Sequence, residues 1–162
     1  MNPSILRKPP ALLLLVVLVA ALGACGTEPA SGEVVGGLPE GTLVISNGDS
    51  LTLQVQLALT PSAQARGLMG VEEIPQDYGM VFLWSEPGVH AFHMKDTLIP
   101  LDIAFWDTGG RIVDIQTMEP CRQANCPIYT PSGEHIAAVE VRGGLLESNG
   151  VKVGDRVELT ET

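Results

Sequence analysis

Residues 42–59, TLVISNGDSLTLQVQLAL, carry the pattern that decides the fold class. Every second residue from 51 to 59 is apolar, which is the period of a β-strand with one buried face. Asn47-Gly48-Asp49 separates this run from the apolar residues 42–46 and is typical of a hairpin turn. The segment therefore predicts two antiparallel strands joined by a short loop.

The rest of the chain repeats short apolar runs between turn residues. Thr60-Pro61 predicts the start of a short helix, because threonine caps helix N-termini and proline fits the first helical position. Further strands are expected at 79–84, 89–94, 101–106, 111–118, 135–142 and 156–160, with a helical turn within 143–150. The 18 Gly, 12 Pro and 4% aromatic residues also favour a mainly β fold, a β-rich α+β domain. We expect an antiparallel, partly closed barrel or sandwich with one or two short helices.

The first 24 residues have the pattern of an export signal. Arg7 and Lys8 precede twelve apolar residues, 11–22, a run too short to span a bilayer. Leu22-Gly23-Ala24-Cys25 then resembles the lipobox of bacterial lipoproteins, whose cysteine receives a diacylglyceryl group and becomes the mature N-terminus. We expect a lipoprotein signal peptide at 1–24 and lipidation at Cys25, with a secretory signal and an incidental cysteine as the alternative. Two or three acyl chains would hold the protein on the extracytoplasmic face of the cell membrane.

Composition sets the domain organisation and excludes one class of partner. Residues 26–40, GTEPASGEVVGGLPE, lack apolar periodicity and predict a flexible tether over 25–40, followed by a single domain over 41–162. Nine Lys and Arg stand against 19 Asp and Glu, which gives a net charge of −10. An acidic chain without a basic surface is not expected to bind nucleic acid.

Several short motifs follow one another in the domain. They are Thr60-Pro61, Arg66-Gly67-Leu68-Met69, Gly79-Met80-Val81-Phe82, the run from His93 to Ile103, Met118-Glu119-Pro120-Cys121, Tyr129, Ala138-Val139-Glu140-Val141, Gly143-Gly144 and Gly154-Asp155. In this order they resemble the domain of unknown function 192 family of bacteria and archaea. The resemblance covers about residues 44–159 and implies no established activity.

Two cysteines remain once Cys25 is assigned to acylation. Cys121 and Cys126, in CRQANC, most simply form a disulfide in an exported protein. Closing so short a loop stabilises the fold by about 2 kcal/mol in the chain-entropy model. A redox-active pair is the alternative, although the spacing differs from C-x-x-C.

Polar side chains within the family motifs are candidate ligand-binding groups: Lys95, Asp96, Thr97, Asp102, Tyr129 and Arg66. Segment 94–103 lies between two expected strands, where loops present binding groups. If the apolar residues of the strand expected at 101–106 face inward, Asp102 faces water or a groove. If Asp102 is instead buried, its carboxylate needs partners such as Arg66, Lys95 or the Thr97 hydroxyl. Arg66 either forms an ion pair with Glu140 or binds an anionic ligand through its guanidinium group. Tyr129 either lies at the rim of a pocket or covers one end of the barrel.

His90, His93 and Met94 are candidate ligands of a copper site, with Met69, Met80, Met118 and His135 as further donors. The spacing opposes it, because residues three apart in a strand face opposite sides. No G-x-S-x-G, H-E-x-x-H or phosphate-binding loop occurs, so no catalytic residue or cofactor is assigned. We expect a binding or accessory module whose partner is a small molecule or an envelope protein. The alternatives are an enzyme acting on a cell-envelope substrate and a copper-binding protein.

Overall fold

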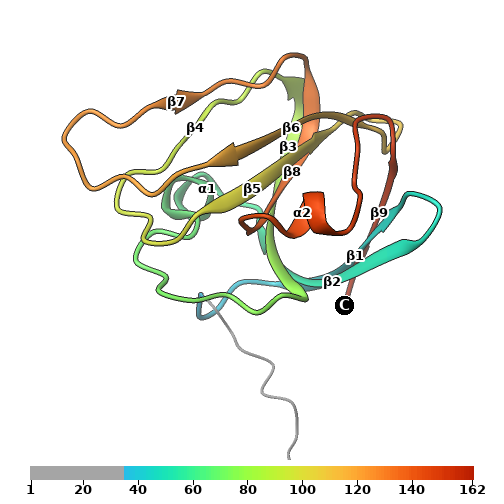
Figure 1. The fold of residues 1–162 in the computed structure, drawn as a ribbon, viewed down its shortest axis with the longest axis horizontal. Helices are drawn as coiled ribbons and strands as arrows, with labels where there is room; N and C mark the ends of the chain where they lie inside the picture. The colour runs from blue at the N-terminus through green and yellow to red at the C-terminus, as the bar shows by residue number, and fades with distance from the viewer. Residues whose placement is uncertain (1–34) are drawn as a thin grey trace, which may run out of the picture. The chain divides into compact units, whose positions relative to one another are not determined.

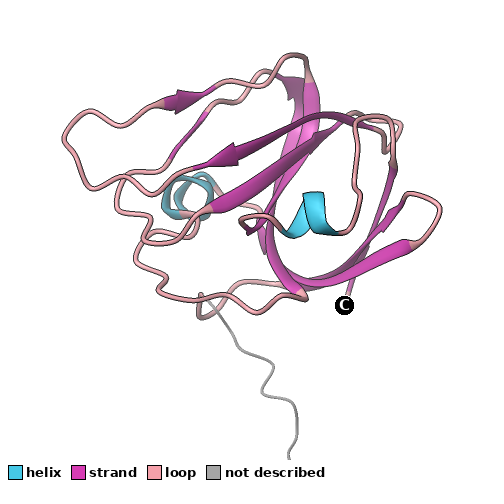
Figure 2. Ribbon diagram, in the orientation of Figure 1, coloured by secondary structure: helices cyan, strands magenta, loops and turns pink. Residues whose placement is uncertain are grey.

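The computed structural model describes residues 35–162; the expected signal peptide, Cys25 and most of the expected tether lie outside the described residues. The elements within 35–162 are β1 (Glu40–Ser46), β2 (Ser50–Ala58), α1 (Pro61–Arg66), β3 (Tyr78–Gly88), β4 (Phe92–His93), β5 (Leu101–Trp106), β6 (Ile112–Met118), β7 (Ile128–Tyr129), β8 (His135–Arg142), α2 (Leu145–Ser148) and β9 (Arg156–Glu161) (Figures 1 and 2). Among them, neither helix has the length and apolarity needed to cross a bilayer.

One seven-stranded sheet forms most of the domain, in the order β6-β5-β8-β3-β2-β1-β9. Its pairs are antiparallel except β2 and β3, which run parallel because the connection through α1 carries the chain back to the same end of the sheet. The mainly β fold with two short helices is confirmed, and the expected antiparallel pairing holds throughout this sheet except between β2 and β3.

The sheet curls until its two edge strands meet at one end. The amide of Ile112 in β6 donates to the carbonyl of Asp155 at 2.9 Å, and the amide of Val157 in β9 donates to the carbonyl of Gly110 at 2.7 Å. Gly110 has a positive φ of 70°, and a Cβ there would lie 2.7 Å from the Val157 carbonyl oxygen. Glycine is therefore required where the edges join, and the sheet is the partly closed barrel expected from the sequence.

The central strands are buried on both faces of the sheet. One face packs inside the curl against α2 and includes Val81, Ala104, Val139 and Val141. The opposite face packs beneath α1 and includes Met80, Phe82, Ile103, Phe105 and Ala138. Because side chains alternate along a strand, neighbouring residues of β5 and β8 belong to different cores.

The hairpin and the helix after it form as expected. β1 and β2 pair from Glu40↔Gln56 to Ser46↔Ser50. The Thr60 hydroxyl accepts a hydrogen bond from the Ala63 amide at 3.2 Å, which caps α1, and Pro61 occupies its first turn.

One expectation about the elements was wrong. The strand expected at 89–94 is reduced to the two residues of β4, because β3 continues to Gly88 and β4 pairs only with β7, a strand that the sequence did not predict. The packed chain also starts before residue 41. Val35 is buried, and its amide and carbonyl bond to the side-chain amide of Gln56 at 2.9 and 2.6 Å, so the last residues assigned to the tether are held by β2.

Candidate functional site

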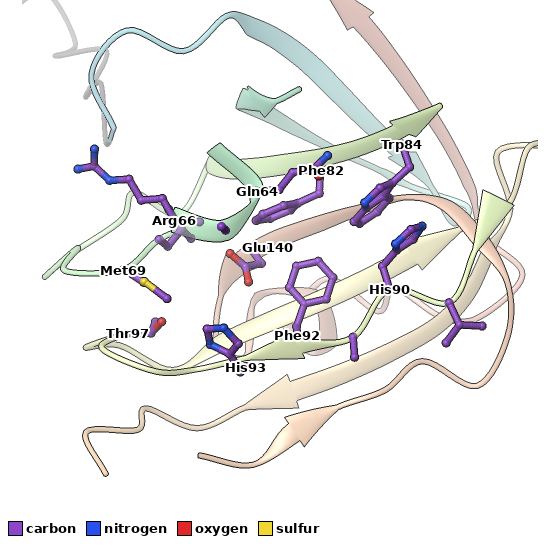
Figure 3. A pocket seen from close by; sticks show the side chains of 15 residues that line it. Gln64, Arg66, Met69, Phe82, Trp84, His90, Phe92, His93, Thr97 and Glu140 are labelled. Atoms are coloured by element: carbon purple, nitrogen blue, oxygen red, sulfur yellow. The ribbon is translucent and has the colours of Figure 1, made fainter. Parts of the chain in front are cut away.

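A cleft of about 440 Å³ lies beneath α1. The helix and residue Gly67 form one side, and residues 89–93 with Thr97 form the other (Figure 3). The floor comes from β3 and β8, on the sheet face that carries Phe82 and Glu140. The volume falls within the usual range for small-molecule sites.

Aromatic rings line the cleft. Phe82 and Phe92 meet edge to face with their ring centroids 5.0 Å apart. Trp84 lies on the same face of β3 as Phe82 and stacks flat on the His90 imidazole, with a centroid distance of 4.1 Å and an interplanar angle of 2°. The rings therefore pack on one another along the wall of the cleft.

The Glu140 carboxyl projects into this cleft beside its aromatic rings (Figure 3). The residue is 5% exposed, and its Oε2 has no hydrogen-bond partner among the described residues. Burial raises the pKa of Glu140 to about 8, because the low-polarity surroundings disfavour the charged form. The carboxyl is therefore mostly protonated at neutral pH.

Glycine and glutamine position the helix over the carboxyl. Gly67 ends α1 with φ 48° and ψ −136°, a conformation that side chains disfavour, and its absent Cβ would lie 3.7 Å from Oε2 of Glu140. The Gln64 side-chain amide donates to the carbonyls of Ala58 at 3.2 Å and Leu83 at 2.7 Å. These bonds tie α1 to β2 and β3 and fix the roof of the cleft.

Two imidazoles close the inner end of the aromatic wall. His90 and His135 lie edge to face with centroids 5.2 Å apart, and Nε2 of each lacks a partner among the described residues. Burial lowers the pKa of both, and for His135 a bond with the Gly133 carbonyl opposes the shift while His90 adds to it. Both rings are therefore neutral at pH 7.

Two of the candidate ligand-binding residues lie at the cleft. Thr97 is 4% exposed and contributes to its wall, whereas Arg66 is exposed and directs its guanidinium away from it (Figure 3). The ion pair expected between Arg66 and Glu140 is not formed, and that expectation was wrong. The reason is that Arg66 stands on the outer surface of α1 while Glu140 lies beneath the helix.

Lys95 and Asp96 are exposed but lie outside the cleft lining. Asp96 holds the segment in place through its backbone: its amide donates to the Cys121 carbonyl at 3.0 Å, and its carbonyl accepts from the Gly70 amide at 2.9 Å. Its φ of 56° is uncommon for a residue with a side chain. The segment is thus clamped between two loops.

Asp102 is buried and hydrogen-bonded within the fold, which is the second of the two arrangements considered from the sequence. It is 2% exposed and accepts hydrogen bonds from the Thr117 hydroxyl at 2.9 Å and from the Leu146 amide at 3.1 Å. It faces α2, on the side of the sheet opposite the cleft, because β5 is central and buried on both faces. None of the partners suggested by the sequence is used.

The expected disulfide between Cys121 and Cys126 is present, with Cα atoms 5.8 Å apart. Tyr129 lies beside it, and its hydroxyl accepts a hydrogen bond from the Glu119 amide at 3.1 Å. Residues 119–129 border a second, shallower hollow of about 520 Å³. Tyr129 therefore rims a pocket, but not the one that contains Glu140.

The copper site is not assembled. Within residues 35–162, no three His, Cys, Asp or Glu side chains are grouped so that they could hold a metal ion. His90 stacks on Trp84, whereas His93 lies toward the opposite end of the cleft (Figure 3), where its Nδ1 accepts the Lys95 amide at 3.4 Å. Met94 is buried in the core beneath α1 with Met80 and Met118.

Sequence reasoning missed Glu140 and the aromatic walls as a site. Its signal is the lone carboxylate in the strand HIAAVEVR, at the same parity as Ala138 on a face that has to be buried. The contribution of Phe92 and His90 had no local signal, because the segment that carries them leaves the main sheet.

Comparison with known proteins assigns the chain to a family. The model of DUF192, described as "Uncharacterized ACR", matches residues 42–159. The chain belongs to the DUF192 family. UPF0127 proteins of Thermococcus sibiricus and Pyrococcus horikoshii are 28% identical over 115 residues and 25% identical over 121 residues, covering 70% and 72% of this chain and 70% and 97% of their own.

Two solved bacterial structures share the DUF192 fold. A protein of unknown function from Novosphingobium aromaticivorans has a TM-score of 0.69 and 31% identity, over 81% of this chain and 89% of its own. A putative transcription regulator from Sinorhizobium meliloti has a TM-score of 0.70 and 27% identity, over 75% and 95%. The family itself is uncharacterised, so any activity has to be argued from the site.

Proposed function

We propose that this DUF192 protein is a lipid-anchored, extracytoplasmic binding or accessory module whose ligand site is the cleft beneath α1. The observation that carries the proposal is the Glu140 carboxyl, buried at the base of an aromatic cleft with Oε2 unpartnered. A buried polar atom without a partner is unfavourable by about 1 to 3 kcal/mol, so a ligand that bonds to it recovers that free energy.

The anchoring part of the proposal rests on the sequence. Two basic residues, a twelve-residue apolar run and Leu22-Gly23-Ala24-Cys25 occur in the order that lipoprotein processing requires. Val35, the first residue that the structure describes, is already buried in the domain, and nine residues of sequence separate it from Cys25.

A role in transcription is not proposed. The name of the Sinorhizobium protein suggests one for that protein. The net charge of −10 in this chain opposes binding to a polyanion, and the cleft holds an acid rather than a phosphate-binding group.

The binding site is tested by screening envelope metabolites and peptides against the mature protein by thermal shift. Ligands are expected to raise the melting temperature of the wild type, and Glu140→Gln is expected to weaken the shift. Lys95→Ala is the matched control, because it changes a polar residue outside the cleft and should leave the shift intact. Loss of binding in Lys95→Ala with retention in Glu140→Gln would move the site to segment 94–103.

The anchor is tested with Cys25→Ala. The wild type is expected in the membrane fraction with a diacylglyceryl group on Cys25, and the variant is expected uncleaved or wrongly processed and without acylation. Mass spectrometry of the mature protein decides the point. An unmodified Cys25 in the membrane fraction contradicts the anchor and leaves the cleft proposal standing.

An enzyme is the second candidate, favoured by the raised pKa of Glu140. A carboxylic acid with a pKa of about 8 can deliver a proton near neutral pH, as a general acid requires. Turnover of a cell-envelope fraction by the wild type and its loss in Glu140→Gln would support this function. Binding without any product would leave the module as first proposed.

A further inference from the structure

The polar and aromatic groups of the cleft together specify a ligand chemistry. Oε2 of Glu140 offers an acceptor at the base, and no protein donor reaches it. Phe82 and Phe92 surround the approach to it with ring edges and faces (Figure 3). Aromatic faces attract cations through the ring quadrupole, most strongly when water is excluded.

Positive charge is absent from the inner part of the cleft. The charged or titratable groups that line it with Glu140 are Arg66 on α1 and His90 and His93 on the segment before β5. Arg66 points away from the carboxyl, His93 is exposed, and the neutral His90 ring is stacked on Trp84. The strand neighbours of Glu140 are Met80 on β3 and Ile103 on β5, and neither is charged.

We infer that the cleft beneath α1 binds a small organic cation, an ammonium or guanidinium group on an apolar body, with Glu140 as its counter-ion and the rings as its walls. This inference rests on the proposed binding function. An anion would be repelled by the Glu140 carboxyl as it ionises with rising pH, and no cation stands beside that carboxyl to offset the repulsion. A neutral ligand would satisfy Oε2 and pack on the rings, but it would lack the attraction of a positive charge to the ring faces and to a chain of net charge −10.

Binding of a cation is coupled to proton release. The free carboxyl has a pKa of about 8 and is about nine-tenths protonated at pH 7. A bound cation favours the carboxylate, so Glu140 gives its proton to the solvent and close to one proton is released per ligand. Affinity therefore rises with pH until the carboxyl is ionised in the free protein.

The test uses three matched probes on the mature protein in nanodiscs: phenethylammonium, the neutral 2-phenylethanol and the anionic phenylacetate. Calorimetry in buffers of different ionisation enthalpy measures affinity and proton release, and the indole NMR signal of Trp84 places the probe in the cleft. Empty nanodiscs give the background for partitioning into lipid.

Phenethylammonium is expected to bind at least about tenfold more tightly than either analogue at pH 7.5, and Glu140→Gln is expected to remove that preference. Its affinity should rise about 16-fold between pH 6.5 and 8, with about 0.9 proton released at pH 7, because ionisation of a group with a pKa of about 8 controls both. An alkylammonium stays charged throughout this range. Glu140→Gln should abolish the pH dependence.

Phe92→Leu is a second variant that keeps the carboxyl and removes one ring. It should weaken phenethylammonium several-fold while leaving proton release unchanged. Lys95→Ala should behave as the wild type.

The outcomes separate this inference from the proposed function. Equal or tighter binding of the alcohol or the carboxylate in the cleft overturns the cation inference and leaves a binding module. The cation inference is also overturned if phenethylammonium binds the Glu140→Gln variant as tightly as it binds the wild type. If no probe and no library compound perturbs Trp84 at about 10 mM, both are overturned.

Discussion

Glu140 and Asp102 are buried carboxylates on neighbouring strands with opposite environments. Asp102 receives hydrogen bonds from a hydroxyl and from a backbone amide of α2. Glu140 has an unpartnered oxygen in an aromatic cleft. Side-chain alternation sends one to each face of the sheet, so Asp102 is hydrogen-bonded to the fold and Glu140 lines the cleft.

Glu140 makes stability depend on pH in a direction that can be measured. Its pKa is raised to about 8 in the folded state from 4.5, so the folded protein holds a proton that the unfolded chain releases. Stability from this group is present below pH 4.5 and is lost as pH rises toward 8, by up to about 1.4 kcal/mol per unit.

The half-buried His90 and the buried His135 change stability in the other direction. Their pKa values are lowered on folding, so they cost stability as pH falls below about 6.5. The free energy of unfolding, measured by urea from pH 6.5 to 8, should therefore fall in the wild type and stay flatter in Glu140→Gln. Parallel curves for the two proteins would contradict a protonated Glu140.

Asp102 should be important for stability and Lys95 should not. Asp102→Ala leaves the Thr117 hydroxyl and the Leu146 amide without their acceptor, at an expected cost of about 2 to 4 kcal/mol. Lys95→Ala changes an exposed side chain and is expected to cost less than about 1 kcal/mol. Denaturant unfolding of the two variants compares them, and similar losses would refute this description of the segment.

At the scale of elements, α1 forms the roof of the cleft and ends at Gly67. A methyl group at this position would stand 3.5 Å from Cζ of Phe82 and would force a positive φ on alanine. Gly67→Ala should cost about 1 to 3 kcal/mol through backbone strain. Gly70→Ala also has a positive φ but no atom within 4 Å, so it controls for strain alone. Both are measured by thermal unfolding, and weaker cleft binding is expected only for Gly67→Ala.

The disulfide loop supports the cleft from behind, since the Cys121 carbonyl accepts the amide of Asp96 next to Thr97. Arg122 lies between the two cysteines, so trypsin cuts inside the closed loop. Without reductant, the two tryptic peptides should remain linked in mass spectra, and with reductant they should separate. Peptides already separate before reduction would contradict the bond. Its removal by Ser at both positions should cost about 2 kcal/mol.

On the scale of the whole domain, the first strand depends on the last. β1 pairs with β9 from Gly41↔Glu161 to Ser46↔Arg156, and Val157 reaches into the core within the curl. Deleting residues 156–162 should therefore abolish cooperative unfolding. Deleting Thr162 alone removes a single bond from its amide to the Glu40 carbonyl and should be tolerated. Circular dichroism melting curves distinguish the two, and a cooperative transition in the longer deletion would contradict this dependence.

The amino-acid sequence determined the local features of this protein. The hairpin, the Thr60-Pro61 helix start, most of the strands and the disulfide follow from periodicity, capping chemistry and cysteine spacing, all of which act between residues near one another in the chain. The resemblance to the family was also visible in the sequence, from the order of the motifs along the chain. The strand prediction for residues 89–94 was wrong, because this segment pairs outside the main sheet and its sequence has no clear strand periodicity.

Only the tertiary structure decided which polar residues meet. Glu140 enters the cleft because β8 lies between β3 and β5 and turns that side chain beneath α1. Asp102 is buried because both faces of β5 are covered by other parts of the domain. Burial on a face depends on elements distant in sequence, and no local pattern records which of them will cover it. The desolvation that gives Glu140 its raised pKa exists only once those elements have packed.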